Sequence, residues 1–272
     1  MDLPEVVNRV LPAVVALGSR IVPSQNPQTP LFPLIFGTGF LIDPRGIVVT
    51  NNHVAQLLTK LPAEAQLAIL YVPEQKKEAG SAAGLLFRKI VGFSLLREFN
   101  PGQPYYGEDV PDIAFLQIDV REVPYLILNR EPNVIQIGRE VGVAGYPLGD
   151  RPLTIHGKIS QLTATVRRGI ISAVYPAPSR FPDGFTTDIA VQGGNSGSPV
   201  FLADSGLVVG MIHAHAVGAQ NIALALPSNM IATGLESSLD KGAPDTAAFP
   251  TWESLLANEG QTDLGWTILS PT

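Results

Sequence analysis

Short apolar runs, separated by glycine and proline turns, fill most of the chain. Residues 5–11 predict a short helix that ends before Pro12, and the valine-rich run after it predicts a strand. The last run, 227–239, predicts a closing helix. Many short strands between frequent turn signals indicate an all-β sandwich or barrel. The remaining strands are expected at 36–42, 47–50, 65–72, 85–96, 113–118, 137–146, 163–174 with a bend at 167–169, 185–191, 200–202, 207–213 and 221–226, with a helical turn at 56–63.

The composition suits a globular protein and excludes several classes. The 272 residues are 45% hydrophobic and 15% charged, which is enough apolar material for a large core. A net charge of −6 argues against a dedicated nucleic-acid binder, and the absence of cysteine excludes disulfides and thiolate metal sites. No apolar run approaches the roughly 20 residues of a membrane span. The acidic start, residues 1–5, lacks the pattern of a secretion signal, so we expect a soluble, cytoplasmic protein.

The glycine-rich stretch 193–199 carries the first candidate chemistry. It places Ser196 in the turn Gly-Gly-Asn-Ser-Gly-Ser-Pro, directly before an apolar run. Glycines let backbone amides approach a bound atom closely, so a serine there can attack a carbonyl while amides stabilise the oxyanion. A plain turn between two strands is the alternative. A serine nucleophile also needs a base and a group that orients the base.

Two further residues supply those roles in a suitable setting. His53 follows the apolar strand at 47–50, and Asp112 opens the apolar strand at 113–118. Each also has a purely structural interpretation: His53 as a structural histidine and Asp112 as an ordinary turn aspartate. Together with Ser196 they give the chain order His, Asp, Ser.

At this point the sequence resembles the trypsin-like serine proteases, and specifically the HtrA/Deg branch, over about residues 5–235. The resemblance implies two packed six-stranded antiparallel β-barrels, the first at about 5–125 and the second at about 134–235, within a protease domain of residues 1–239. The remaining residues, 240–272, are too few for a PDZ domain, and Trp252 and Trp266 suggest that this tail packs on the body. The matching segments are Gly-Thr-Gly-Phe at 37–40, Val-Thr-Asn-Asn-His-Val at 49–54, Asp-Ile-Ala-Phe-Leu at 112–116, Thr-Asp-Ile-Ala-Val at 187–191, Gly-Asn-Ser-Gly at 194–197 and Ala-Leu-Pro-Ser-Asn-Met at 225–230.

The expected reaction is peptide-bond hydrolysis without a cofactor. Ser196 would attack the carbonyl, His53 would move the proton, and Asp112 would orient the imidazole. The amides of Gly194 and Ser196 would form the oxyanion hole. The resemblance implies a polypeptide substrate and a specificity pocket with Ala190 at its base. The same alignment gives the pocket wall as Met211, Ile212 and His213.

Other readings fit less well or stay open. An α/β-hydrolase would need Gly-x-Ser-x-Gly and the order Ser, Asp, His, whereas Ser198 replaces the last glycine here. No phosphate-binding glycine loop is present. His213 and His215 lack an evident third ligand, so we expect no metal.

The sequence departs from the family in two places and leaves three states open. Ser198 stands where the family usually has glycine, and an insertion is expected around residues 94–111. The chain could be an active endopeptidase, a binding module that does not cut, or a protease whose oxyanion loop is turned away until a ligand binds. HtrA-type proteins are commonly trimers, and the sequence leaves the oligomeric state open.

Overall fold

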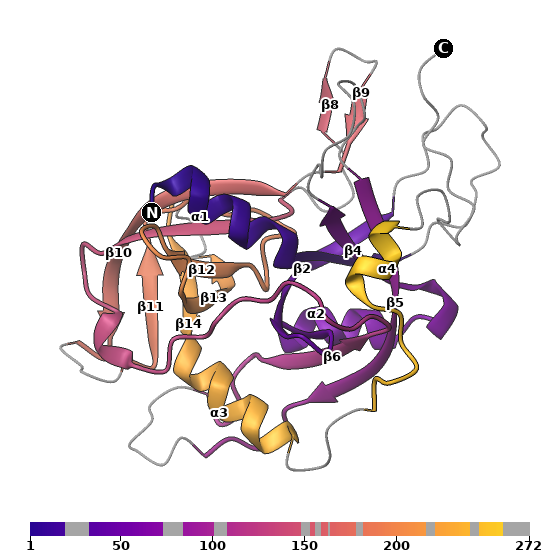
Figure 1. Cartoon of the computed structure of the whole chain (residues 1–272). Helices are drawn as coiled ribbons and strands as arrows, with labels where there is room; N and C mark the ends of the chain where they lie inside the picture. The colour runs from indigo at the N-terminus through magenta and orange to yellow at the C-terminus, as the bar shows by residue number, and fades with distance from the viewer. Residues whose placement is uncertain are drawn as a thin grey trace.

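Two closed antiparallel barrels of six strands each form the body of the protein, as a computed structural model shows (Figure 1). The structure describes residues 1–19, 33–72, 84–100, 108–147, 153–155, 159–162, 164–177, 182–215, 221–239 and 245–257. The all-β, two-barrel prediction is therefore confirmed.

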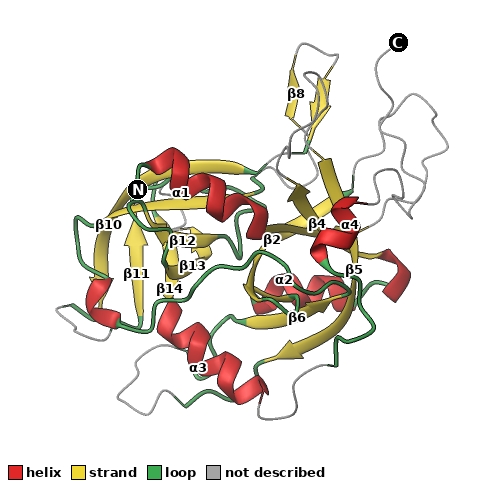
Figure 2. Cartoon of the chain, in the orientation of Figure 1, coloured by secondary structure: helices red, strands yellow, loops and turns green. Residues whose placement is uncertain are grey.

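Each barrel closes in its own strand order. The first runs β1-β2-β3-β6-β5-β4, and the second runs β10-β11-β14-β13-β12-β7. The hairpin β8–β9 stands apart from both barrels (Figure 2). The strands are β1 (Val14–Ser19), β2 (Leu34–Asp43), β3 (Ile47–Thr50), β4 (Gln66–Val72), β5 (Gly84–Leu95), β6 (Ala114–Ile118), β7 (Glu140–Gly145), β8 (Leu153–Ile155), β9 (Ile159–Gln161), β10 (Thr165–Tyr175), β11 (Gly184–Thr187), β12 (Pro199–Leu202), β13 (Val208–His215) and β14 (Ala223–Pro227).

The barrels are accompanied by short helices. They are α1 (Leu3–Val10), η1 (Leu11–Ala13), α2 (Asn52–Thr59), η2 (Ala63–Ala65), η3 (Pro132–Val134), α3 (Ser228–Leu239) and α4 (Trp252–Ala257). Within the described ranges, none of these helices has the length and apolarity needed to span a bilayer. The helix α1 begins at a capping box, in which Asp2 and Glu5 each accept the other's backbone N–H.

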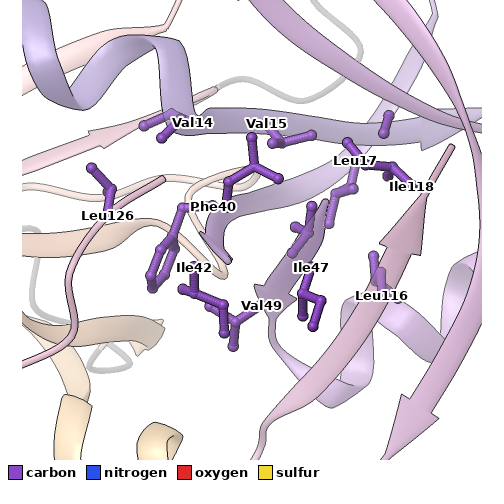
Figure 3. Packing of buried hydrophobic residues seen from close by; sticks show 14 of the residues in the cluster. Val14, Val15, Leu17, Phe40, Ile42, Ile47, Val49, Leu116, Ile118 and Leu126 are labelled. Carbon is purple, nitrogen blue, oxygen red and sulfur yellow. The ribbon is translucent and has the colours of Figure 1, made fainter. Parts of the chain in front are cut away.

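The core of the first barrel includes apolar side chains from β1, β2, β3 and β6 (Figure 3), and β4, β5 and α2 add to it. Leu17, Phe40 and Val49 are fully buried there. The same cluster continues into Tyr146 and Phe201 of the other half, so apolar packing joins the two barrels. Such burial is worth roughly 1.5–3 kcal/mol for each large side chain.

The helices α1 and α3 each contact the barrel that is not next to them in sequence. The helix α1 precedes the first barrel but lies against the β12–β13 hairpin, where Val6 and Val10 face Gly206. The helix α3 follows the second barrel and contacts its strands β13 and β14, and its Gly234 also faces Leu96 and Phe115 of the first barrel. Each helix therefore ties its own barrel to the other.

Several predicted elements differ in detail. Residues 167–169, where a bend is expected, pair in register with β7 inside β10, and the irregularity of this strand lies between Ile171 and Ala173. The helical turn expected at 56–63 starts earlier, at Asn52. Trp252 is buried, and the backbone of Arg121 pairs with Thr251 beside it. Trp266 and residues 101–107 of the expected insertion lie outside the described residues.

Candidate active site

His53 and Asp112 form the best-defined pair of the site. His53 lies in the first turn of α2, and Asp112 lies two residues before β6. The Nδ1 atom of His53 is 2.7 Å from Oδ2 of Asp112, and the backbone N–H of His53 donates to Oδ1 at 3.0 Å. The carboxylate thus acts as an N-terminal cap for α2 and also fixes the imidazole ring.

A buried asparagine holds the backbone of Asp112 in place. Asn51 occupies the cap position of α2, but its side chain makes no capping bond. Its amide instead donates to the backbone carbonyl of Asp112 at 2.9 Å. Asn51 is fully buried, so this bond fixes where the segment leading into β6 meets the helix bearing His53.

The electrostatics keep Asp112 ionised. Burial by itself raises the pKa of this carboxyl, but the two hydrogen bonds from His53, and the attraction of His53 and His213, outweigh burial. The pKa of Asp112 therefore lies below its ordinary value of 3.8. An ionised Asp112 accepts a proton-bearing Nδ1, which leaves the other ring nitrogen of His53 free to act as a base.

The glycine-rich stretch forms a tight turn before Ser196. The N–H of Asn195 donates to the carbonyl of Gln192 at 3.0 Å, and Gly194 has φ of +96°. Gly193, at the second position, does not have positive φ, so the turn follows the type II pattern, which favours glycine at the third position. Gly197 has φ of +87°, and a Cβ at that position would lie 1.9 Å from the carbonyl oxygen of Thr38. Both glycines are therefore required by the backbone.

The turn is fastened to the first barrel. The N–H of Thr38, on β2, donates to the carbonyl of Ser196 at 2.8 Å. The N–H of Gly197 donates to the carbonyl of Ile212 at 2.8 Å, which fixes the turn to β13 as well. Among the described residues, the Ser196 hydroxyl has no hydrogen bond to His53, a contact that often tightens only with substrate.

Ser198 fits tightly behind this turn. Its side chain is fully buried, and a Cβ added at Gly145 would lie 2.0 Å from its hydroxyl oxygen. Its N–H donates to the carbonyl of Asn195 at 2.9 Å. A serine at this position is therefore accommodated by the glycine opposite it on β7.

Of the four residues predicted for the specificity pocket, two are buried in the apolar cores and two keep exposed surface. Met211 and Ile212 are 0% and 1% exposed and belong to the two separate apolar cores, because adjacent strand residues point to opposite faces. His213 and Ala190 keep exposed surface. Ala190 accepts a hydrogen bond at its carbonyl from Nη1 of Arg167 at 2.8 Å.

Burial lowers the pKa of His213 below its ordinary 6.5. His53 adds to the shift, while the negative charges of Asp112 and Glu108 oppose it. His213 therefore lies within electrostatic reach of the His53–Asp112 pair.

Sequence reasoning missed two residues that support the site. Thr38 and Asn51 are both fully buried and both bond to atoms next to the candidate catalytic groups. Both lie inside segments that carried the family resemblance, at 37–40 and 49–54. Their roles depend on contacts with residues 61 to 156 positions away, which no local pattern reveals.

Comparison with known proteins identifies the family. A family model described as the trypsin-like peptidase domain matches residues 37–211, more than half of the chain. The chain belongs to the trypsin-like peptidase family. This peptidase domain is similar to a probable periplasmic serine endoprotease, DegP-like, from Chlamydia pneumoniae, with 27% identity over 215 residues, 77% of this chain and 35% of that protein. A DegP-like counterpart from Hahella chejuensis is 25% identical over 234 residues, 84% of this chain and 40% of that protein.

Solved structures share the fold of this peptidase domain. An HtrA-type protease, AlgW with decapeptide, superposes with a TM-score of 0.58 at 22% identity, over 89% of this chain and 69% of that chain. A serine endoprotease from Yersinia pestis superposes with a TM-score of 0.56 at 21% identity, over 89% of this chain and 68% of that chain. This peptidase domain spans well under half the length of the two curated relatives described above.

Proposed function

We propose that this chain is a serine endopeptidase that cleaves unfolded or flexible polypeptides through an acyl-enzyme. Ser196 Oγ attacks the peptide carbonyl while His53 takes its proton. His53 then returns a proton to the leaving amine, and Asp112 stabilises the imidazolium between these steps. Water repeats the sequence to release the acyl group from Ser196.

The observation that carries the proposal is that Asp112 contacts both the backbone and the ring of His53. One carboxylate oxygen accepts the backbone N–H of His53, and the other lies 2.7 Å from Nδ1 of its ring. Two bonds from one carboxylate fix both the position and the rotation of the imidazole. A histidine with only a structural role would not require that second contact to an ionised group.

The turn before Ser196 supports an assembled oxyanion hole. In a type II turn the central peptide, here between Gly193 and Gly194, is flipped relative to a type I turn. The positive φ of Gly194 therefore selects the orientation in which its N–H, and not the Gly193 carbonyl, can face a bound oxyanion. Together with the N–H of Ser196, this gives two donors, each worth roughly 3–4 kcal/mol in comparable sites.

Labelling with a serine-directed fluorophosphonate tests the proposal directly. We expect the wild-type chain to be labelled at Ser196 and to cut a chemically unfolded protein. Ser196→Ala should lose both activities while it remains folded. Ser205→Ala is the matched control, because Ser205 is exposed in the β12–β13 turn and should leave both activities unchanged.

Each other outcome points to an alternative. A wild-type chain that binds unfolded protein but is never labelled would be a non-catalytic module. A chain labelled only after a peptide is added would be a latent protease whose turn orders on binding. Labelling that survives in Ser196→Ala would show that the nucleophile is assigned wrongly.

A further inference from the structure

Thr38 connects the first barrel to the glycine-rich turn through its side chain as well as its backbone. It is fully buried on β2. Its hydroxyl donates to the carbonyl of Gly194 at 2.7 Å and accepts the N–H of Tyr146 at 3.0 Å. Its own N–H donates to the carbonyl of Ser196 at 2.8 Å.

These bonds lie on both sides of one peptide. The carbonyls of Gly194 and Ser196 flank the Asn195–Ser196 peptide, which carries the N–H of Ser196. Fixing a carbonyl on each side limits rotation of that peptide. The same Gly194 carbonyl also follows directly on the type II turn, so holding it opposes the flip that would convert the turn to type I.

We propose that Thr38 is a positioning residue that holds the oxyanion-binding turn in its active conformation from the opposite barrel, a role that rests on the function proposed above. The hydroxyl is suited to this task because it is both donor and acceptor. The N–H of Tyr146, at the end of β7, orients it so that its proton faces Gly194. The turn is thereby tied to β2 and β7 at once.

Removing the hydroxyl should free the turn. In Thr38→Val the shape is kept, but the buried Gly194 carbonyl and Tyr146 N–H lose their partner. The Gly194 carbonyl then loses the hydrogen bond that holds it in place. The turn can adopt conformations in which the N–H of Ser196 no longer points toward the oxyanion. The loss should therefore fall on transition-state binding and not on ground-state binding.

The experiment compares a peptide aldehyde with the matching peptide amide. Ser196 Oγ adds to the aldehyde carbon, its proton passes to His53, and the carbonyl oxygen becomes the oxyanion held by the turn. We expect Thr38→Val to lower kcat and aldehyde affinity by about 10²-fold, with KM and amide affinity unchanged. Thr50→Val is the matched control, because Thr50 is equally buried and its hydroxyl donates only to the Thr38 carbonyl.

A second pair keeps the test decisive if the valine variant does not fold. Thr38→Ser and Thr38→Ala differ by the hydroxyl alone, and we expect the serine variant to retain the aldehyde preference that the alanine variant loses. Equal losses in both, equal weakening of aldehyde and amide, or wild-type kcat without the hydroxyl would overturn the role of Thr38. A wild-type chain that does not prefer the aldehyde would instead refute the proposed function.

Discussion

At the residue scale, Asp112 is predicted to control the tautomer of His53. In Asp112→Asn the side-chain oxygen can still accept the backbone N–H of His53. Its amide, however, would donate to Nδ1, so the ring would carry its proton on the nitrogen that must accept one from Ser196. We expect kcat to fall on the order of 10⁴-fold with the fold retained, as measured on a peptide substrate.

The control for that change is Asp204→Asn. Asp204 is an exposed carboxylate in the β12–β13 turn, and its Oδ2 lies 2.7 Å from Nη2 of Arg139. Such surface pairs contribute about 0–1 kcal/mol, so turnover should not change. Comparable losses in the two variants would indicate a general charge effect and contradict the orienting role of Asp112.

Residue chemistry also predicts the substrate preference. Ala190 offers no carboxylate to a basic side chain, and the guanidinium of Arg167 already lies 2.8 Å from its carbonyl oxygen. A buried lysine or arginine would therefore be unpaired and would meet like charge, which costs several kcal/mol. We expect cleavage after valine, alanine or leucine, with weak discrimination among them.

Mass-spectrometric mapping of the cuts in an unfolded protein measures this preference. A majority of cuts after lysine or arginine would show that Ala190 is not at the base of the pocket. Because Met211 and Ile212 are buried in the cores, substitutions there should change stability more than they change the preference.

At the scale of elements, α1 is predicted to stabilise a barrel to which it does not belong. Val6 is fully buried, and its methyl groups lie against Gly206 of the β12–β13 hairpin. Val6→Ala should lower the free energy of unfolding by about 1–3 kcal/mol, the range expected for two lost methyl groups and a small cavity. Urea titration of the two proteins measures this difference in the free energy of unfolding.

The neighbouring valine provides the comparison for α1. Val7 is only partly buried on the same helix, so Val7→Ala changes helix propensity equally and loses less packing. The loss should be clearly smaller than for Val6→Ala. Equal effects would indicate that α1 contributes through its own helix stability and not through contact with the second barrel.

For the whole molecule, stability should fall as the pH falls. The pKa of His213 lies below 6.5 because of burial, and that of Asp112 lies below 3.8 because the His53 contacts outweigh burial. In both cases the unfolded chain binds the proton more readily, so acid favours unfolding. The His213 contribution is lost below about pH 6.5 and the Asp112 contribution below about pH 3.8.

The variant His213→Gln isolates the first of these windows. Its thermal midpoint should fall less than that of the wild type between pH 7.5 and pH 5, since glutamine has no proton to gain. The groups that act on His213 are Asp112, Glu108 and His53, all of which remain in this variant. Parallel curves for the two proteins would show that His213 does not contribute to the pH dependence.

The sequence by itself determined the parts that depend on local chemistry. Turn residues and apolar runs predicted most strand positions, and the strands expected at 200–202 and 207–213 pair as β12 and β13. The segments around His53, Asp112 and Ser196 indicated the family, since the chemistry requires those residue types in that setting. The tertiary structure brought His53 and Asp112 together as that order predicts.

Only the tertiary structure decided which partners each residue meets across the barrels. Strand alternation placed Met211 and Ile212 in different cores, and barrel closure paired Gly169 with Val141 of β7. The Thr38 hydroxyl reaches a carbonyl 156 residues away, and α1 lies on the barrel it does not precede. Such contacts depend on how two closed sheets pack, and no local pattern of residues contains that information.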